Sequence, residues 1–460
     1  MMRLKSIKKL TVIALSSALA IGISKPLTAE QRNLISHPRT PYRLAFYKRH
    51  NPSYRVAGAL HFGHSKLHDV LLLTPFKRHK EEDSKLYEEI IKVYNNPPKI
   101  EPTMELYAPY SARATWRLFR TIDSVHLLHE ITEDIMSDNN TPWNQKEKVL
   151  KEAYEYYRKT YKDIVLSPAP LDITMRRAGV MMKPYFSLTR NYYTKNNNFF
   201  YAAHWWHPAV YESMMIGGND QEQDLMINKM EELFKSQVIP NPPMRMILSR
   251  EGMPRYSRLS PETANVFDNL HMLHGITYDI FAYDGWTIEQ KRAELYRVLD
   301  AMSYHPGDEK FIRKFTTPKP KFNPLNYDKW TKSSEGAMTT MMIEMLDEMM
   351  PMMMQQHGQM NHQMHASLKK QLKLKLTPGI QEGEIEGSFM DAMMQIMPNM
   401  QMSPEAMQPG KINPMMINTM LKGWEEKYGD LPDIEPIPMD IDPSASQELS
   451  TLINPESVTP

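Results

Sequence analysis

The sequence predicts a mainly α-helical protein, in which a tandem-duplicated helical domain is followed by a flexible methionine-rich tail. Three observations lead to this fold class. Apolar residues recur at helical intervals between residues 41 and 315. A motif of two histidines and one carboxylate occurs there four times at constant spacing. Beyond residue 315 the composition changes, and proline and methionine become abundant.

Residues 1–29 have the three parts of a secretory signal peptide. Basic residues such as Arg3 and Lys5 precede an apolar, alanine-rich stretch over residues 10–24. A small-residue cleavage site ends at Ala29, and a second possible one ends at Ala20. We therefore expect export, most simply to a bacterial periplasm, with no membrane span after cleavage. An uncleaved signal that anchors the chain in the inner membrane is the alternative.

The composition excludes several classes of function. The chain has no cysteine, so disulfides, thiolate metal sites, covalent c-type haem and a lipoprotein anchor are all excluded. Its formal net charge is +1, and no basic cluster outside the signal predicts a nucleic-acid partner. Any metal chemistry must therefore rely on histidine, carboxylate and methionine side chains.

Two homologous helical repeats are predicted, over residues 41–165 and 180–315. Segments with helical spacing of apolar residues occur in both, for example at 85–94 and 225–234. The strongest match lies between residues 122–135 and 267–280, which share eight identities at an offset of 145. Such a constant offset over a long stretch is typical of a tandem repeat.

The repeated motif reads His-x-x-His, then four residues, then Asp or Glu. Spacings of three and eight residues fall within one broad face of a helix. Imidazoles and carboxylates on one face are ligands that a first-row transition metal accepts. Each repeat carries two copies, and the four are His61, His64 and Asp69; His126, His129 and Asp134; His204, His207 and Glu212; His271, His274 and Asp279.

The two copies in each repeat differ in their predicted setting. The copies around His126 and His271 are predicted to lie in uninterrupted helix. Pro208 directly follows His207, and the residue before a proline avoids the helical region, so we expect His204 and His207 at or just before a helix start. The first repeat has His68 where the second has Tyr211.

Asp123 and Asp268 extend the helical copies by a carboxylate three residues before the first histidine. Such carboxylate–histidine pairs resemble, in spacing alone, the ligand pairs of helix bundles with di-iron or di-manganese centres. In that arrangement Asp69 and Glu212 would add single carboxylates. Two other interpretations remain: Asp123 and Asp268 fix the imidazole tautomers, or the motif is a metal-free, hydrogen-bonded Asp–His core.

The sequence does not decide which histidines meet. One site per repeat is the simpler expectation, because a self-sufficient unit would then have been duplicated. A single dinuclear centre at a pseudo-twofold interface between the repeats is the alternative.

The chain beyond residue 315 is predicted to consist of a proline-rich linker (316–336), a methionine- and histidine-rich segment (337–425) and a disordered tail (426–460). Residues 338–420 hold 21 of the 38 methionines. Thioether sulfur suits Cu(I), but methionine also makes adaptable docking surfaces. The candidate secondary ligands are Met349, Met350, Met352, Met353, Met354, His357, Met360, His362, Met364 and His365.

Together these patterns predict an exported transition-metal-binding protein. Copper is favoured, while iron, manganese and zinc remain possible. The first alternative is an oxidase with a dinuclear centre of iron, manganese or copper. The second is a metal-free periplasmic scaffold that docks a protein partner through its methionine-rich segment.

Overall fold

The structure is a computed structural model. It describes residues 44–101, 103–162, 164–178, 189, 193–217, 219–243, 246–283, 285–312 and 327. These residues are mainly helical and form no β-strand; a single bridge pairs Leu166 with Ser303. The predicted helical fold class is thus confirmed for this part of the chain. The predicted signal peptide, linker and methionine-rich tail lie outside the described residues, apart from Tyr327.

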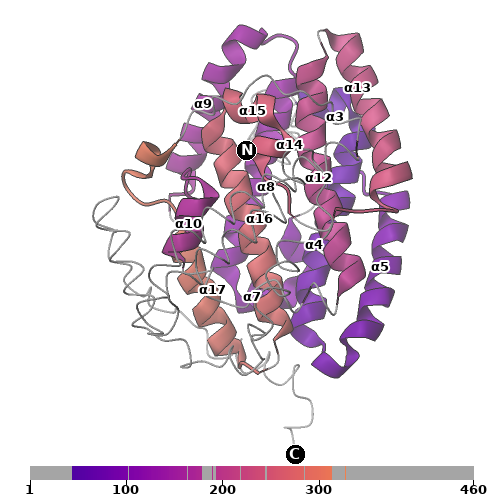
Figure 1. The fold of residues 1–460 in the computed structure, drawn as a ribbon, viewed down its shortest axis with the longest axis vertical. Coiled ribbons are helices and arrows are strands. Elements are labelled where there is room, and N and C mark those ends of the chain that lie inside the picture. Colours follow the sequence, from indigo (N-terminus) through magenta and orange to yellow (C-terminus); the bar gives the residue numbers. More distant parts are fainter. Residues whose placement is uncertain are drawn as a thin grey trace, which may run out of the picture.

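Four long helices form the centre of the molecule (Figure 1): α4 (Asn51–Leu73), α8 (Trp116–Ser137), α12 (Thr194–Ile216) and α16 (Pro261–Ala282). Helix α4 packs against α12 and α16, and α8 packs against the same two helices. Each helix therefore has both helices of the other half of the chain as its neighbours. We call residues 44–178 the first half and residues 189–312 the second half.

Shorter helices surround this bundle. Helix α5 (His79–Asn95) packs on α4, and α9 (Trp143–Thr160) packs on α8. In the second half, α13 (Asp220–Leu233) packs on α12 and α17 (Ile288–Met302) on α16. The remaining helices are α3 (Ala45–Arg49), α6 (Met104–Tyr107), α7 (Pro109–Ala114), α10 (Leu171–Arg177), α14 (Ser249–Gly252) and α15 (Pro254–Leu259), with short turns η1 (Phe76–Arg78), η3 (Phe234–Val238) and η4 (Asp308–Phe311).

The same order of helices occurs twice along the chain. Helices α4 to α9 run long, long, short, short, long, long, and helices α12 to α17 repeat that order. The two ligand-bearing helices of the first half span 23 and 22 residues, and so do those of the second half. The four central helices are therefore matched in length as well as in place.

The expectation that a helix begins near His204 and His207 is wrong. Helix α12 runs from Thr194 to Ile216 with Pro208 inside it. A proline in a helix removes one hydrogen bond and crowds the preceding turn, at a cost of roughly 3 kcal/mol. Because every residue from 199 to 214 is buried, side-chain packing offsets that cost.

Close packing around the ligand-bearing helices depends on Gly63, between two signature histidines on α4. A Cβ atom there would lie 3.0 Å from Phe199 on α12 and 3.3 Å from Ile90 on α5. The glycine thus lets the two neighbouring helices approach α4 closely, at the level of the histidines.

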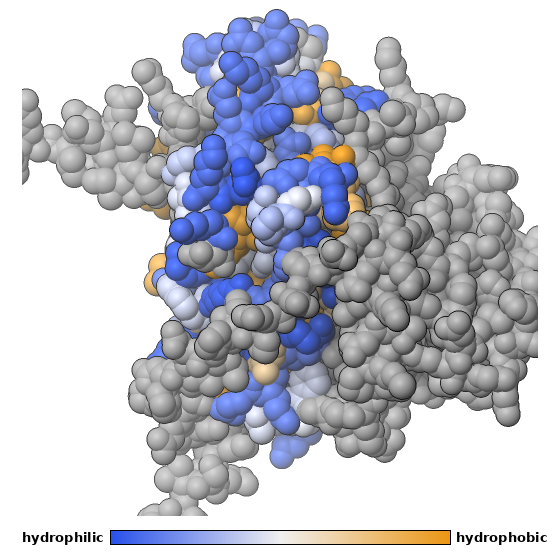
Figure 2. Space-filling view, turned by 90° about the vertical axis from the view of Figure 1, so that its left-hand side faces the viewer, coloured by the Kyte–Doolittle hydropathy of each residue, from blue (hydrophilic) through white to orange (hydrophobic). Residues whose placement is uncertain are grey.

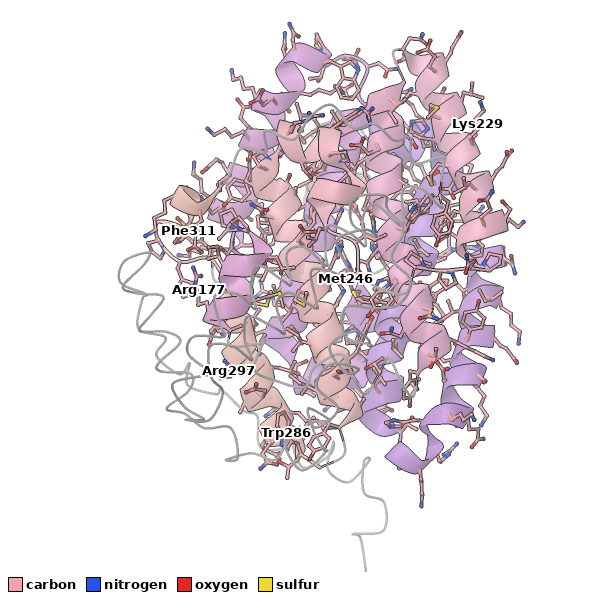
Figure 3. The ribbon with its side chains drawn as sticks, viewed as in Figure 1. Arg177, Lys229, Met246, Trp286, Arg297 and Phe311 are labelled. Carbon is pink, nitrogen blue, oxygen red and sulfur yellow. The ribbon has the colours of Figure 1, made fainter. Side chains whose placement is uncertain are left out.

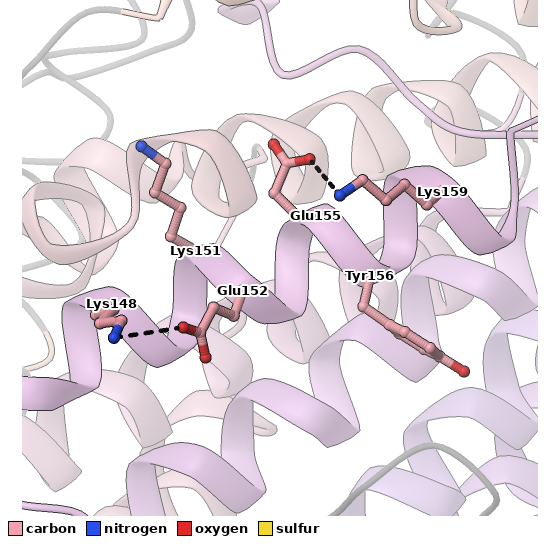
Figure 4. A pocket seen from close by; sticks show the side chains of 6 residues that line it. All are labelled: Lys148, Lys151, Glu152, Glu155, Tyr156 and Lys159. Atoms are coloured by element: carbon pink, nitrogen blue, oxygen red, sulfur yellow. Dashed lines mark ion pairs between the residues drawn. The ribbon is translucent and has the colours of Figure 1, made fainter.

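The outer surface is predominantly hydrophilic in the view of Figure 2, as expected for amphipathic helices around a buried core. A shallow surface pocket on α9 shows the same character (Figure 4): its lysines and glutamates form exposed pairs, including Lys148–Glu152 and Lys159–Glu155 at 3.8 Å. We interpret it as a solvated helix face. Among the described helices, none has the length and apolar character needed to cross a membrane.

Candidate metal centre

The eight signature histidines meet in the middle of the bundle. All are buried, with 1–8 % of their surface exposed. Rings from diagonally opposite helices approach most closely: His61 stacks on His126, and His204 lies edge-on to His271, each with 3.9 Å between ring centroids. We refer to these eight residues as the histidine cluster.

The cluster joins the two halves of the chain. Ring centroids of His129 and His207 are 4.5 Å apart, and those of His64 lie 5.2 Å from His204 and 5.6 Å from His274. The structure therefore differs from the expectation of one site per repeat. Adjacent helices in the bundle come from opposite halves, so imidazoles of both halves meet at the centre, although the two closest ring pairs each lie within one half.

Three groups within the cluster could each hold a metal ion. In each group, one donor atom from every residue lies within 4.8 Å of the other two. Only the first group comes from a single half of the chain. The groups are His61, Glu101 and His126; His129, Glu133 and His207; and His64, His204 and His274.

Hydrogen bonds direct several imidazoles toward metal binding. Nδ1 of His64 lies 2.5 Å from the carbonyl oxygen of Leu60, and Nδ1 of His204 lies 2.6 Å from that of Phe200. A carbonyl can only accept, so Nδ1 must carry the proton in both rings. Each Nε2 then keeps its lone pair, the form that binds a metal ion.

In two further histidines the partner of Nδ1 is a side chain: a tyrosine hydroxyl for one and a glutamate carboxylate for the other. Nδ1 of His129 lies 2.8 Å from the hydroxyl of Tyr211, and Nδ1 of His61 contacts Glu101. The Nε2 atoms of both histidines are buried and have no hydrogen-bond partner among the described residues. The same holds for both ring nitrogens of His274. Buried polar atoms usually have a partner, so these nitrogens are available as donors to a metal ion.

Burial keeps most of these imidazoles neutral. It lowers the pKa of His64 to about 3 and the pKa values of the other cluster histidines except His61 well below 6.5. At His61 burial also lowers the pKa, but the charge and hydrogen bond of Glu101 outweigh it and raise the value. Burial raises the pKa of Glu133 well above 4.5. Neutral imidazoles bind metal without first losing a proton.

The signature carboxylates bind backbone amides instead. Asp69 accepts hydrogen bonds from the backbone N–H groups of Tyr110 and Ser111, at the start of α7. Glu212 accepts from those of Arg255 and Tyr256 at the start of α15, and also pairs with the Arg255 guanidinium at 2.6 Å. Both carboxylates therefore hold a short helix against the bundle, where its positive N-terminal dipole favours an anion.

The other four predicted carboxylates have comparable partners. Asp123 accepts from the N–H of Met104 at the start of α6, and Asp268 accepts from that of Ser249 at the start of α14. The remaining two, Asp134 and Asp279, accept from the N–H groups of Phe46 and Thr189. None of the six belongs to the three ligand groups among the described residues. The structure thus separates the histidines of the motif from its carboxylates.

Helical geometry explains this separation. A helix turns about 100° per residue, so positions i, i+3 and i+7 lie within about 60° of one another, whereas i+8 lies at least about 80° away. The carboxylate of each signature is at i+8 and faces a neighbouring segment. The residues at i+7 face the cluster instead, and they are His68, Glu133, Tyr211 and Tyr278.

The sequence interpretation missed Glu101, Glu133 and His68 as site residues. The i+7 position was the available signal for Glu133 and His68, because each continues the face defined by the two histidines before it. Glu101 had no such signal: it lies in a loop and reaches His61 only through the tertiary fold. The predicted tail ligands, Met349 to His365, lie outside the described residues.

Comparison with known proteins gives no relative: no family model, no curated protein and no solved structure matches this chain.

Proposed function

We propose that this chain is a transition-metal-binding protein whose histidine cluster holds adjacent metal ions in the core of the bundle. The observation that carries the proposal is the set of buried imidazole nitrogens on His61, His129 and His274, which belong to the three ligand groups and have no hydrogen-bond partner among the described residues. Without an ion, each unsatisfied buried group costs about 1–3 kcal/mol. Metal coordination removes that cost and supplies the partner for each lone pair.

The donor set favours a borderline ion. Imidazole suits copper, zinc, iron and nickel, and a carboxylate extends the range to manganese. We favour copper, because residues 338–420 also supply many methionine thioethers, which suit Cu(I). In this proposal the tail captures or passes Cu(I) in the periplasm, after export directed by residues 1–29, and the cluster holds the ion more firmly.

We further infer that the two halves arose by duplication. The sequence offset of 145 is matched by contacts: Met104 N–H to Asp123 in the first half corresponds to Ser249 N–H to Asp268 in the second. Lysines at the same offset also correspond, because Lys146 and Lys291 both donate to carbonyl groups at the end of the preceding ligand-bearing helix. A cluster built from both copies then has approximate twofold symmetry.

A dinuclear oxidase is the second candidate. Each group offers three protein donors, and catalytic metal sites characteristically keep a fourth position open for water, oxygen or substrate. Tyr211 places a hydroxyl against His129 within this region. Such an enzyme would show oxygen consumption that depends on the loaded metal, whereas a handling protein would not.

Elemental analysis of the purified mature protein tests metal binding. The comparison variant changes His126, His129, His271 and His274 to Gln, and the matched control changes Asp123 and Asp268 to Asn. We expect bound copper, iron, manganese or zinc in the wild type, loss of most of it in the histidine variant and retention in the control. A folded wild type that stays metal-free after incubation with each ion would overturn the proposal and favour the scaffold.

A further inference from the structure

The two ends of the histidine cluster are chemically different although their histidines correspond. The first half has three glutamates whose equivalents in the second half, at the sequence offset of 145, are not acidic. They are Glu101, Glu130 and Glu133, and the equivalent residues are Met246, Gly275 and Tyr278. Every carboxylate of the centre is therefore contributed by the first half. Figure 3 labels Met246 in the middle part of the molecule, and its side chain is buried.

One end combines imidazoles with carboxylates. Glu133 lies 4.0 Å from Nε2 of His207, and its Oε1 atom is buried with no hydrogen-bond partner among the described residues. Glu101 contacts His61 in the adjoining group, and its side chain is only 7 % exposed. We call these two groups, with their four histidines, the carboxylate end.

The other end consists of imidazoles. His64, His204 and His274 form the group, and His68 lies beside it, with its ring centroid 5.4 Å from that of His274. His68 is fully buried, and neither of its ring nitrogens has a hydrogen-bond partner among the described residues. Its outer neighbours, Phe119 and Phe281, are apolar rings. We call these four histidines the imidazole end.

Charge and donor chemistry assign different ions to the two ends. A divalent ion in a buried site needs negative charge nearby, because an uncompensated charge is costly in a low-dielectric interior. Glutamates supply that charge at the carboxylate end, and carboxylate oxygen is a preferred donor for Mn(II). Four neutral imidazoles supply no charge, which favours a monovalent, softer ion.

We propose, on the basis of the proposed function, that the centre is mixed-metal. The carboxylate end binds a divalent ion with oxygen affinity, such as Mn(II) or Fe(II). The imidazole end binds Cu(I), with His68 as its fourth ligand. His68 thus joins the site as a metal ligand, in addition to the seven signature histidines of the three groups.

The test loads metal-free protein with Mn(II) and Cu(I) together, without oxygen, and measures bound metal by elemental analysis after desalting. Electron paramagnetic resonance reads the Mn(II) separately, because Cu(I) is silent. Two variants with nearly isosteric changes are compared: E101Q/E133Q at the carboxylate end and H68Q/H274Q at the imidazole end. Circular dichroism checks both folds, and the single variants E133Q and H68Q replace any pair that does not fold.

We expect E101Q/E133Q to bind Mn(II) more than about tenfold more weakly while it retains Cu(I), and H68Q/H274Q to show the reverse. Equal losses of both metals in the two variants would overturn the mixed-metal centre but leave metal binding intact. So would a wild type that takes up only one of the two metals. A wild type that binds neither would overturn the proposed function, and this inference with it.

Discussion

The two ends of the histidine cluster are built on the same helical framework but differ in the residues at position i+7. In both halves a pair of long helices presents His-x-x-His to the centre, and the closest ring contacts, His61–His126 and His204–His271, are equal at 3.9 Å. The i+7 residues differ: Glu133 and Tyr211 occupy this position at one end, and His68 and Tyr278 at the other, where their ring centroids are 4.7 Å apart. A bundle with matched helices can thus tune the charge of its core through single side chains.

The i+8 carboxylates sharpen this comparison, because they should affect folding and not metal content. Glu212 is 1 % exposed on its side chain and pairs with Arg255, whose side chain is 28 % exposed, so E212Q breaks a partly buried ion pair. We expect a loss of about 3 kcal/mol in the free energy of unfolding, measured by urea denaturation. D69N, its counterpart in the first half, should cost only about 1–2 kcal/mol, because Asp69 accepts from two backbone amides and not from a guanidinium.

Metal content of both folded variants should match the wild type. Loss of metal in folded D69N or E212Q would show that these carboxylates are ligands after all.

The tyrosines at i+7 offer a second contrast. Tyr211 orients His129 by accepting from Nδ1, whereas the Tyr278 hydroxyl donates to the backbone carbonyl of His64 at 3.2 Å. We expect Y211F to weaken metal binding about tenfold, because partners of metal-bound imidazoles contribute on that scale. Y278F should change affinity less. Competition with a chelator of known affinity measures both, and equal effects would contradict the assigned roles.

A further prediction concerns Glu231 on α13 and the pH dependence of stability. Burial raises the pKa of Glu231 to about 7, although Trp206 donates to its carboxylate at 2.9 Å. The folded state therefore holds a proton that the unfolded state loses above pH 4.5, so this residue's stabilising contribution is full below 4.5 and is lost as pH rises through 7.

E231Q should flatten that dependence between pH 4.5 and 7, by no more than about 3 kcal/mol, since one pKa unit corresponds to 1.36 kcal/mol. Urea denaturation at a series of pH values measures the change. An unaltered slope in the variant would contradict the raised pKa.

The sequence predicted the helical class and singled out the eight histidines, because both follow from patterns along one chain, but it did not decide which histidines meet. It placed the carboxylate at i+8 in the site, where helical phase alone would have favoured Glu133 and His68 at i+7. Two features could not be read in this way. Glu101 reaches His61 from a loop, and the continuity of α12 through Pro208 depends on packing against other helices.

The sequence also did not predict that histidines of both halves meet in one cluster. Their meeting depends on which central helices become neighbours, and α4 packs beside α12 and α16 rather than beside α8. That arrangement is a property of the assembled bundle, which local spacing does not encode.

The most direct test of the central claim is anomalous X-ray diffraction from crystals of the metal-loaded protein. We predict anomalous peaks inside the bundle, including one about 2.0–2.1 Å from Nε2 atoms of His64 and of second-half histidines such as His204. A loaded protein with no peak inside the bundle, or one in which no peak has histidine ligands from both halves, would contradict the account.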